Sequence, residues 1–253
     1  MSEMRLALQD VTVSFDGLTV LDHLSLELAK GETRFLIGPN GAGKTTLLDV
    51  ITGRTQPLSG SVHFEGHRLL GRQEHEIARL GIGRKFQTPT IFPSLSVWQN
   101  MEVVLAAQTG LLGALAPLSG ERRDRLAQTL ELTGLMDRAN VRAGTLSHGQ
   151  KQWLEIGMLL AQDPKLLLLD EPVAGMSRGE RERTVELIQR VQETHPGHTM
   201  LVVEHDMTFV RALAKTVTVL HLGSVLSEGT LEEVQTDPRV IEVYLGHNHR
   251  KVA

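Results

Sequence analysis

A glycine-rich segment near the start of the chain carries residue types whose spacing suits the binding of phosphate groups. Residues 38–46 read GPNGAGKTT and match the pattern G-x-x-x-x-G-K-[ST]. Glycines let consecutive backbone N–H groups converge on phosphate oxygens, and a helix that starts here adds partial positive charge. We expect Lys44 to neutralise the β- and γ-phosphates of a nucleoside triphosphate and the Thr45 hydroxyl to ligate Mg²⁺. The residues of this segment expected to contact the nucleotide are Gly38, Pro39, Asn40, Gly41, Ala42, Gly43, Lys44, Thr45 and Thr46.

Two carboxylates, Asp170 and Glu171, follow a short and wholly apolar run at 166–169. Such a run, bounded by prolines, is typical of a strand buried on both faces of a parallel sheet. Ligands of open α/β sheets bind at the carboxyl ends of the strands, where these two residues lie. Asp170 suits Mg²⁺, directly or through water. Glu171 suits the base that polarises an attacking water.

Three single residues each allow two interpretations. His205 follows a second buried run, 199–204, and shares the position of Asp170, but a histidine is more often a solvated surface residue. Gln87 ends an apolar strand just before a proline-containing loop, where a lone glutamine is usually surface as well. Phe15 lies at a strand end beside a turn, either as an aromatic at the edge of the core or as a ring that stacks on adenine.

The segment Leu146-Ser147-His148-Gly149-Gln150 leads into a predicted helix that ends near Ala161. Ser147 and Gln150 form an S-x-x-Q capping box, which is a sufficient structural explanation for both residues. The N-terminus of a helix is also a site for anions, so a second role stays open. Further capping boxes start predicted helices at Ser177 and Thr230.

The elements that must position these residues follow an α/β pattern. A buried strand at 33–37 precedes the glycine-rich segment, and a helix is expected over 44–51. Residues 5–30 alternate like two paired strands, which predicts an antiparallel edge sheet. From 96 to about 134 apolar residues recur at helical spacing and interrupt the α/β pattern, which indicates a separate helical lobe.

Composition limits the classes of protein that the chain could be. The chain has 253 residues, of which 41% are apolar, and a formal net charge of −4, so nucleic acid is not an expected partner. With no cysteine, disulfides and thiolate metal sites are excluded. No apolar run approaches the roughly 20 residues of a membrane-spanning helix, and the start MSEMR has no apolar signal region. We therefore expect a cytosolic chain unless a partner holds it at a membrane.

Taken in order, these motifs resemble those of the ATPase subunits of ABC transporters over nearly the whole chain. Residues 38–46 match the Walker A loop, Gln87 the Q-loop, 146–150 the signature motif, 166–171 the Walker B strand and His205 the switch histidine. Phe15 falls where this family places its adenine-stacking aromatic. The resemblance implies one domain over 1–253 with a P-loop NTPase (RecA-like) core. The core with its antiparallel β subdomain would take 1–87 and 162–230, an inserted helical subdomain 88–161, and a C-terminal helix and tail 231–253.

The family mechanism implies ATP and Mg²⁺ as cofactors and two ATPase subunits that close head to tail over two ATP molecules. Ser147, Gly149 and Gln150 of one chain would cap the γ-phosphate bound to the Lys44 of the other. The implied catalytic residues are Glu171, which polarises water, His205, which orients the γ-phosphate, and Gln87, which links Mg²⁺ to a moving loop. The implied Mg²⁺ ligands are Thr45, Gln87 and Asp170.

Two motifs depart from the family pattern. His148 stands where the signature motif most often has glycine. The D-loop, usually Ser-Ala-Leu-Asp, reads VAGM over 173–176, so the aspartate contact of that loop is not expected here.

Within the family, the segments IGRKFQ, DEPVAGM and VVEHDM look like the branch that serves branched-chain amino acids and urea. The stretch LSHGQKQWLEIGMLLAQDPKLLLLDEPVAGM and the ending DPRVIEVYLG are most similar to urea transporter ATP-binding subunits. This implies an ATPase of a urea importer, with an importer of branched-chain amino acids and a non-transport ABC ATPase as alternatives. The implied partners are two permease subunits, a second ATPase subunit of a different or the same kind, and an extracytoplasmic binding protein. The implied location is the cytoplasmic face of the inner membrane, as a peripheral protein.

Overall fold

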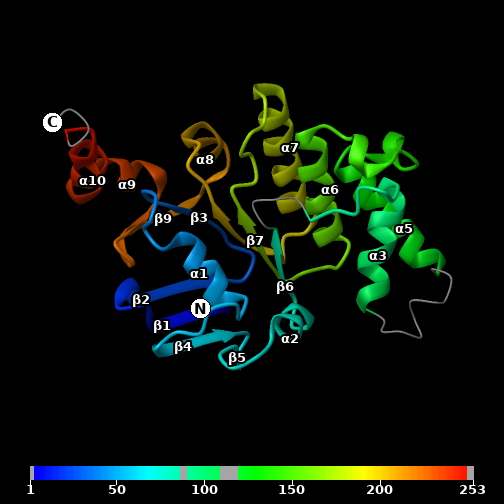
Figure 1. Cartoon of the computed structure of the whole chain (residues 1–253). Coiled ribbons are helices and arrows are strands. Elements are labelled where there is room, and N and C mark those ends of the chain that lie inside the picture. Colours follow the sequence, from blue (N-terminus) through cyan, green and yellow to red (C-terminus); the bar gives the residue numbers. More distant parts are fainter. Residues whose placement is uncertain (1–2, 86–89, 109–118, 250–253) are drawn as a thin grey trace.

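The computed structural model describes residues 3–85, 90–108 and 119–249 (Figure 1). The strands are β1 (Met4–Phe15), β2 (Leu18–Ala29), β3 (Thr33–Ile37), β4 (Ser59–Phe64), β5 (His67–Arg68), β6 (Ile82–Lys85), β7 (Leu166–Asp170), β8 (Thr199–Val203), β9 (Thr216–His221) and β10 (Ser224–Gly229). The helices are α1 (Lys44–Ile51), α2 (Glu74–Arg79), α3 (Val97–Gln108), α5 (Gly120–Leu132), α6 (His148–Leu160), α7 (Arg178–Thr194), α8 (Met207–Leu213), α9 (Leu231–Thr236) and α10 (Pro238–His249). Short 3-10 turns lie at Met136–Arg138 and Ala143–Thr145.

A six-stranded sheet in the order β10-β9-β3-β8-β7-β6 forms the centre of the molecule. Strands β9, β3, β8, β7 and β6 are parallel, and β10 pairs antiparallel with β9. The register pairs Val203 at the end of β8 with Leu36 of β3 and with Asp170 of β7. The carboxyl ends of these three strands therefore meet at one edge of the sheet, as the sequence predicts.

Every residue of β3, β7 and β8 is buried, which explains why these strands are mostly apolar and show no alternation of apolar and polar residues. Along β7, Leu167 and Leu169 join the core cluster that contains the larger helices. Leu166 and Leu168 join the cluster on the other face of the sheet. Because successive side chains of a strand point to opposite faces, one run of four leucines serves both cores.

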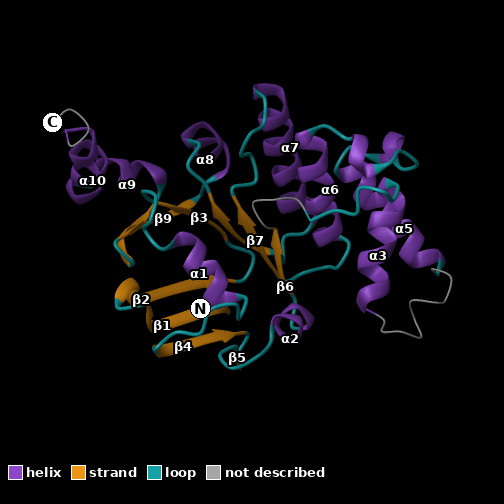
Figure 2. Ribbon diagram, viewed as in Figure 1, coloured by secondary structure: helices purple, strands orange, loops and turns teal. Residues whose placement is uncertain are grey.

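The predicted antiparallel edge sheet over 5–30 is confirmed. Strands β1 and β2 pair antiparallel, and the four-stranded sheet has the order β2-β1-β4-β5. Figure 2 shows α1 between this sheet and the six-stranded one. Apolar residues of α1 share one core cluster with β1, β2 and the central strands. The antiparallel sheet thus packs α1, the helix that follows the glycine-rich segment, against the six-stranded sheet.

The predicted helices of the region 96–134 are present as α3 and α5, and together with α6 they pack into one core cluster. In Figure 1 these helices lie at one end of the molecule, and α9 and α10 lie at the other. The subdomain boundaries given above stay a prediction. Over the residues that the structure describes, no helix has the length and apolar character needed to cross a membrane.

Candidate functional site

The loop between β3 and α1 is shaped by two glycines. Gly38 has a φ of 152°, and a Cβ on it would lie 2.2 Å from the carbonyl oxygen of Leu220. Gly43 has a φ of 99°, and a Cβ there would lie 2.8 Å from the carbonyl oxygen of Val20. Only glycine fits both places without moving the backbone. The loop is therefore fixed by packing against β2 and β9, with α1 starting directly after it at Lys44.

Lys44 extends over this loop. Its Nζ donates hydrogen bonds to the carbonyl oxygens of Gly38 at 2.8 Å and Pro39 at 2.9 Å. Burial lowers the pKa of Lys44, and the negative charges of Glu171 and Asp170 oppose that effect. The ammonium group lies where it could exchange these carbonyls for phosphate oxygens bound in the same loop.

Asp170, at the end of β7, is only 2% exposed. Its Oδ2 accepts a hydrogen bond from Arg84 at 3.2 Å, and its Oδ1 has no hydrogen-bond partner within the described ranges. Burial raises the pKa of Asp170, and the positive charge of Arg84 opposes the rise. A buried carboxylate oxygen without a partner suits a hard cation such as Mg²⁺. Thr45, exposed in the first turn of α1, offers the second predicted oxygen.

Glu171 and His205 lie together at the same edge of the sheet. Glu171 has a φ of 47°, which is uncommon for a residue with a side chain, and its N–H donates to the Val203 carbonyl at 3.0 Å. Its Oε1 lies 3.6 Å from the Nδ1 of the largely exposed His205. A cavity of about 450 Å³ is lined by Gly38, Pro39, Asn40, Glu171, His205, Val243 and Tyr244. The fold thus joins a glycine-rich loop, a carboxylate and a histidine at one cavity.

Glu204 holds the loop that carries His205. Its carboxylate is buried and accepts hydrogen bonds from the backbone N–H groups of Val173 at 3.2 Å, His205 at 2.8 Å and Asp206 at 3.0 Å. Burial raises the pKa of Glu204, and these N–H groups oppose the rise. The side chain therefore ties the segment after Glu171 to the segment that bears His205.

A family model described as "ABC transporter" matches residues 21–174. The chain belongs to the ABC transporter family. As an ABC ATPase it binds ATP and hydrolyses it. A second model, described as "Branched-chain amino acid ATP-binding cassette transporter", matches residues 224–250 of this ABC ATPase.

Curated relatives cover this ABC ATPase almost completely. It is 37% identical to the high-affinity branched-chain amino acid transport ATP-binding protein LivG of Salmonella typhimurium, over 97% of this chain and 99% of that protein. It is 34% identical to BraF of Pseudomonas aeruginosa, with the same coverage. The sequence places the chain in the branch that serves branched-chain amino acids and urea. These relatives support the branched-chain amino acid part of that prediction.

Solved structures confirm the predicted fold class. The ADP conformation of MJ1267, an ATP-binding cassette of an ABC transporter, has a TM-score of 0.83 and 30% identity, and covers 96% of this chain and 99% of its own. The dimeric, post-hydrolysis cassette MJ0796 bound to ADP and Pi has a TM-score of 0.76 and 28% identity, covering 89% and 98%.

The signature residues lie apart from the cavity of their own ABC ATPase chain. Ser147 and Gln150 form the predicted capping box of α6, and neither they nor Gly149 line the cavity beside Lys44. The Ser147 hydroxyl donates to Oε1 of Glu180 on α7 at 2.9 Å, and the Gly149 N–H also bonds to Glu180. The carboxylate of Glu180 therefore accepts hydrogen bonds from donors at the start of α6.

The two motifs that depart from the family pattern contact each other. The Nε2 of His148 lies 3.1 Å from the carbonyl oxygen of Ala174, in the D-loop. A Cβ on Gly175 would lie 3.4 Å from the same ring nitrogen. The ring of His148 thus lies beside Ala174 and Gly175 of the D-loop.

Gln87 lies outside the described residues, but both flanks of its segment are fixed. Lys85 is fully buried with its Nζ 3.8 Å from Glu155 of α6, and the Thr90 N–H donates to the same carboxylate at 3.1 Å.

Phe15 is 49% exposed at the end of β1 and pairs with Leu18 of β2, in the hairpin that packs on Gly43.

Sequence reasoning missed three charged residues of the site: Arg84, Glu180 and Glu204. Arg84 and Glu204 belong to the segments IGRKFQ and VVEHDM, whose resemblance to the family assigns them no role, and the capping box that starts at Ser177 is a sufficient reason for Glu180. The one signal for Glu204 in the sequence is its position at the carboxyl end of the buried run 199–204, where ligand sites of α/β sheets lie.

Proposed function

We propose that the chain is the ATP-hydrolysing subunit of an ABC importer and that Glu171 is its catalytic base. The observation that carries this proposal is the pairing of Glu171 and His205 at the cavity beside the glycine-rich loop. Glu171 would accept the proton of the attacking water, and His205 would orient the γ-phosphate. The residues that would hold Mg²⁺ are Thr45, Asp170 and Gln87, and the bound ion would neutralise phosphate charge. Lys44 and the loop N–H groups would hold the phosphates, and Phe15 would stack on adenine.

Two ATPase subunits would enclose ATP between them, with Ser147, Gly149 and Gln150 facing the nucleotide of the other subunit. Support comes from the placement of these residues away from their own chain's cavity and at the start of a helix. The second subunit would be a different ATPase or a copy of this chain. Closure requires Ser147 to exchange its bond to Glu180 for one to phosphate.

The importer would contain two permease subunits and an extracytoplasmic binding protein, with this chain peripheral on the cytoplasmic face of the inner membrane. The inserted helical subdomain, 88–161, and the Q-loop would press on the permeases as the ATPases close. The remaining assignments are a core with its β subdomain over 1–87 and 162–230 and a C-terminal helix and tail over 231–253.

Branched-chain amino acids are the first candidate cargo, because the relatives named above carry that substrate in their names. Urea is the second candidate. It is favoured by the stretch from LSHGQKQW to DEPVAGM and by the ending DPRVIEVYLG, which resemble urea transporter subunits. The ATPase touches neither cargo, so its own site does not discriminate between them.

The test of the catalytic assignment is Glu171→Gln. The variant should bind ATP with an affinity within about threefold of wild type and hydrolyse it at least about 100-fold more slowly, because only the base is lost. ATP binding is measured by calorimetry and hydrolysis by phosphate release from the purified transporter. Glu182→Gln, on the exposed face of α7, is the matched control for the loss of one carboxylate. Wild-type turnover in Glu171→Gln would refute the assignment.

A further inference from the structure

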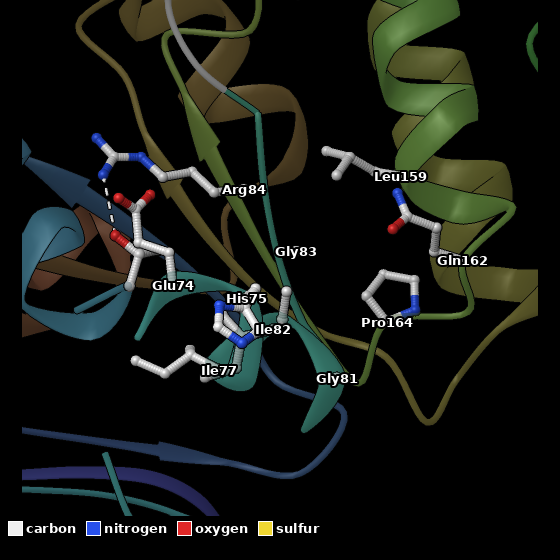
Figure 3. A pocket seen from close by; sticks show the side chains of 12 residues that line it. Glu74, His75, Ile77, Gly81, Ile82, Gly83, Arg84, Leu159, Gln162 and Pro164 are labelled. Atoms are coloured by element: carbon white, nitrogen blue, oxygen red, sulfur yellow. Dashed lines mark hydrogen bonds between the residues drawn. The ribbon is translucent and has the colours of Figure 1, made fainter. Parts of the chain in front are cut away.

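Arg84 is a buried cation between two carboxylates. Its side chain is 4% exposed, and Nη1 lies 2.6 Å from Oδ1 of Asp49 while Nη2 lies 3.2 Å from Oδ2 of Asp170. Nη1 also donates to the Thr52 hydroxyl at 3.4 Å. Figure 3 shows the side chain extending from β6 to the side opposite Leu159 and Pro164.

The two carboxylate partners of Arg84 come from the elements that carry two of the three predicted Mg²⁺ ligands, Thr45 and Asp170. Asp49 lies on α1, the helix whose first turn contains Thr45, and Asp170 ends β7. The guanidinium group therefore connects the helix of the glycine-rich loop to the strand of the acidic motif. A planar group with two separate N–H edges can hold two carboxylates at once, which an ammonium group cannot do in the same geometry.

The two oxygens of Asp170 differ in their surroundings. Oδ2 is held by Arg84, and Oδ1 is buried without a hydrogen-bond partner within the described part of the chain. A carboxylate fixed through one oxygen presents the other in a constant direction. A buried carboxylate oxygen that accepts no hydrogen bond costs free energy of folding unless a ligand binds to it.

We propose that Arg84 is a positioning residue for Asp170, holding Oδ2 and Asp49 together so that Oδ1 faces the metal ion of the bound Mg²⁺–ATP. The inference rests on the proposed role of Asp170 as a Mg²⁺ ligand. Charge alone would act in the opposite direction, because a cation beside the carboxylate repels Mg²⁺. Geometry and charge thus predict different results for substitutions at Arg84.

The experiment measures how much Mn²⁺, standing in for Mg²⁺, raises the affinity for ATP. Calorimetric titrations of the intact chain with ATP are made in Mn²⁺ and in EDTA, in a Glu171→Gln background that prevents turnover. Arg84→Lys keeps the charge and loses the two-edged geometry, so the Mn²⁺ enhancement should fall about tenfold, as for partners that orient a metal ligand. The affinity for ATP in EDTA should stay unchanged, which a general structural defect would not allow.

Arg34→Lys is the matched control, because Arg34 is also buried in the central sheet and pairs with two carboxylates, Glu32 and Glu228. It should keep the wild-type enhancement. If Arg84→Lys fails to fold, Asp49→Asn serves in its place, since Asp49 is partly exposed; it weakens one anchor of Arg84 and should lower the enhancement about twofold to threefold.

A wild-type Mn²⁺ enhancement in Arg84→Lys, or in Asp49→Asn where that variant is used, would overturn the inference. Asp170→Asn separates this result from a failure of the proposed function. If Asp170→Asn loses the enhancement while Arg84→Lys keeps it, the inference alone is wrong. If Asp170→Asn also keeps it, the proposed role of Asp170 falls, and the inference falls with it.

Discussion

The buried carboxylates of Asp170 and Glu204 are each held in part by a group that is distant in the sequence. Glu204 accepts the N–H of Val173, and Asp170 accepts a hydrogen bond from Arg84, which lies 86 positions earlier. Burial is the largest cause that raises the pKa of Asp170 and of Glu204, so folding includes the cost of desolvating both carboxylates. Such costs are typical of functional sites.

Lys44→Ala should lower the affinity for ATP about 10- to 100-fold, because hydrogen bonds to charged groups contribute about 1.5–3 kcal/mol. The fold should persist, since the hydrogen bonds of Lys44 go to part-buried carbonyls of the loop rather than to groups of the core. Calorimetric titration with ATP measures the loss, and Lys30→Ala, at an exposed pair with Glu3, is the control. Equal affinities in Lys44→Ala and wild type would show that the lysine does not contact phosphate.

The motif residues were predictable because their types and spacing are required by phosphate and metal chemistry. The sequence placed Lys44, Asp170, Glu171 and His205 at one edge of a sheet, and the structure brings them together there. Arg84 could not be predicted, since nothing local marks an arginine whose partners lie on other elements. The roles assigned to individual residues stay predictions.

Helix starts were the most predictable elements. The capping boxes at Ser147, Ser177 and Thr230 are all present, because each depends on residues only three positions apart. The capping box of α2, formed by Gln73 and Glu76, was not predicted because glutamine is uncommon at the N-cap position of a helix. The bond between Ser147 and Glu180, which links two helix starts, is long-range and could not be read from spacing.

The capping box of α7 gives a pH-dependent prediction. Hydrogen bonds from the backbone and side chain of Ser177, and then from Ser147, lower the pKa of Glu180. Because the folded-state pKa is below the unfolded value of about 4.3, the ionised group stabilises the fold above that pH, and the contribution is lost as the pH falls through the folded-state pKa. Glu180→Gln keeps a capping box but cannot ionise.

The urea midpoint of wild type should therefore exceed that of Glu180→Gln at pH 7, and the difference should disappear as the pH falls from about 5 toward 3. Unfolding is followed by circular dichroism at each pH. Glu182→Gln, on the same helix, controls for the removal of a charge. A difference that stays constant over this range would contradict the assigned hydrogen bonds.

At the scale of the whole molecule, one parallel sheet separates two core clusters and gathers the strand ends at the cavity. This architecture was predictable, because the alternation of buried strands and helices leaves few other folds. The signature residues lie elsewhere on the same chain, so a complete site as proposed needs a second ATPase. The fold of the ATPase does not depend on the transported solute, since the ATPase is proposed to act through permease subunits.

The most direct test of the central claim, that ATP hydrolysis at Glu171 drives import, is uptake of labelled leucine and labelled urea. Cells of the source organism carrying Glu171→Gln are compared with wild type at equal levels of the protein. Uptake of one of the two solutes should be lost and uptake of the other kept. Loss for leucine would assign the chain to amino acid import, and loss for urea to urea import. Unchanged uptake of both would contradict the claim.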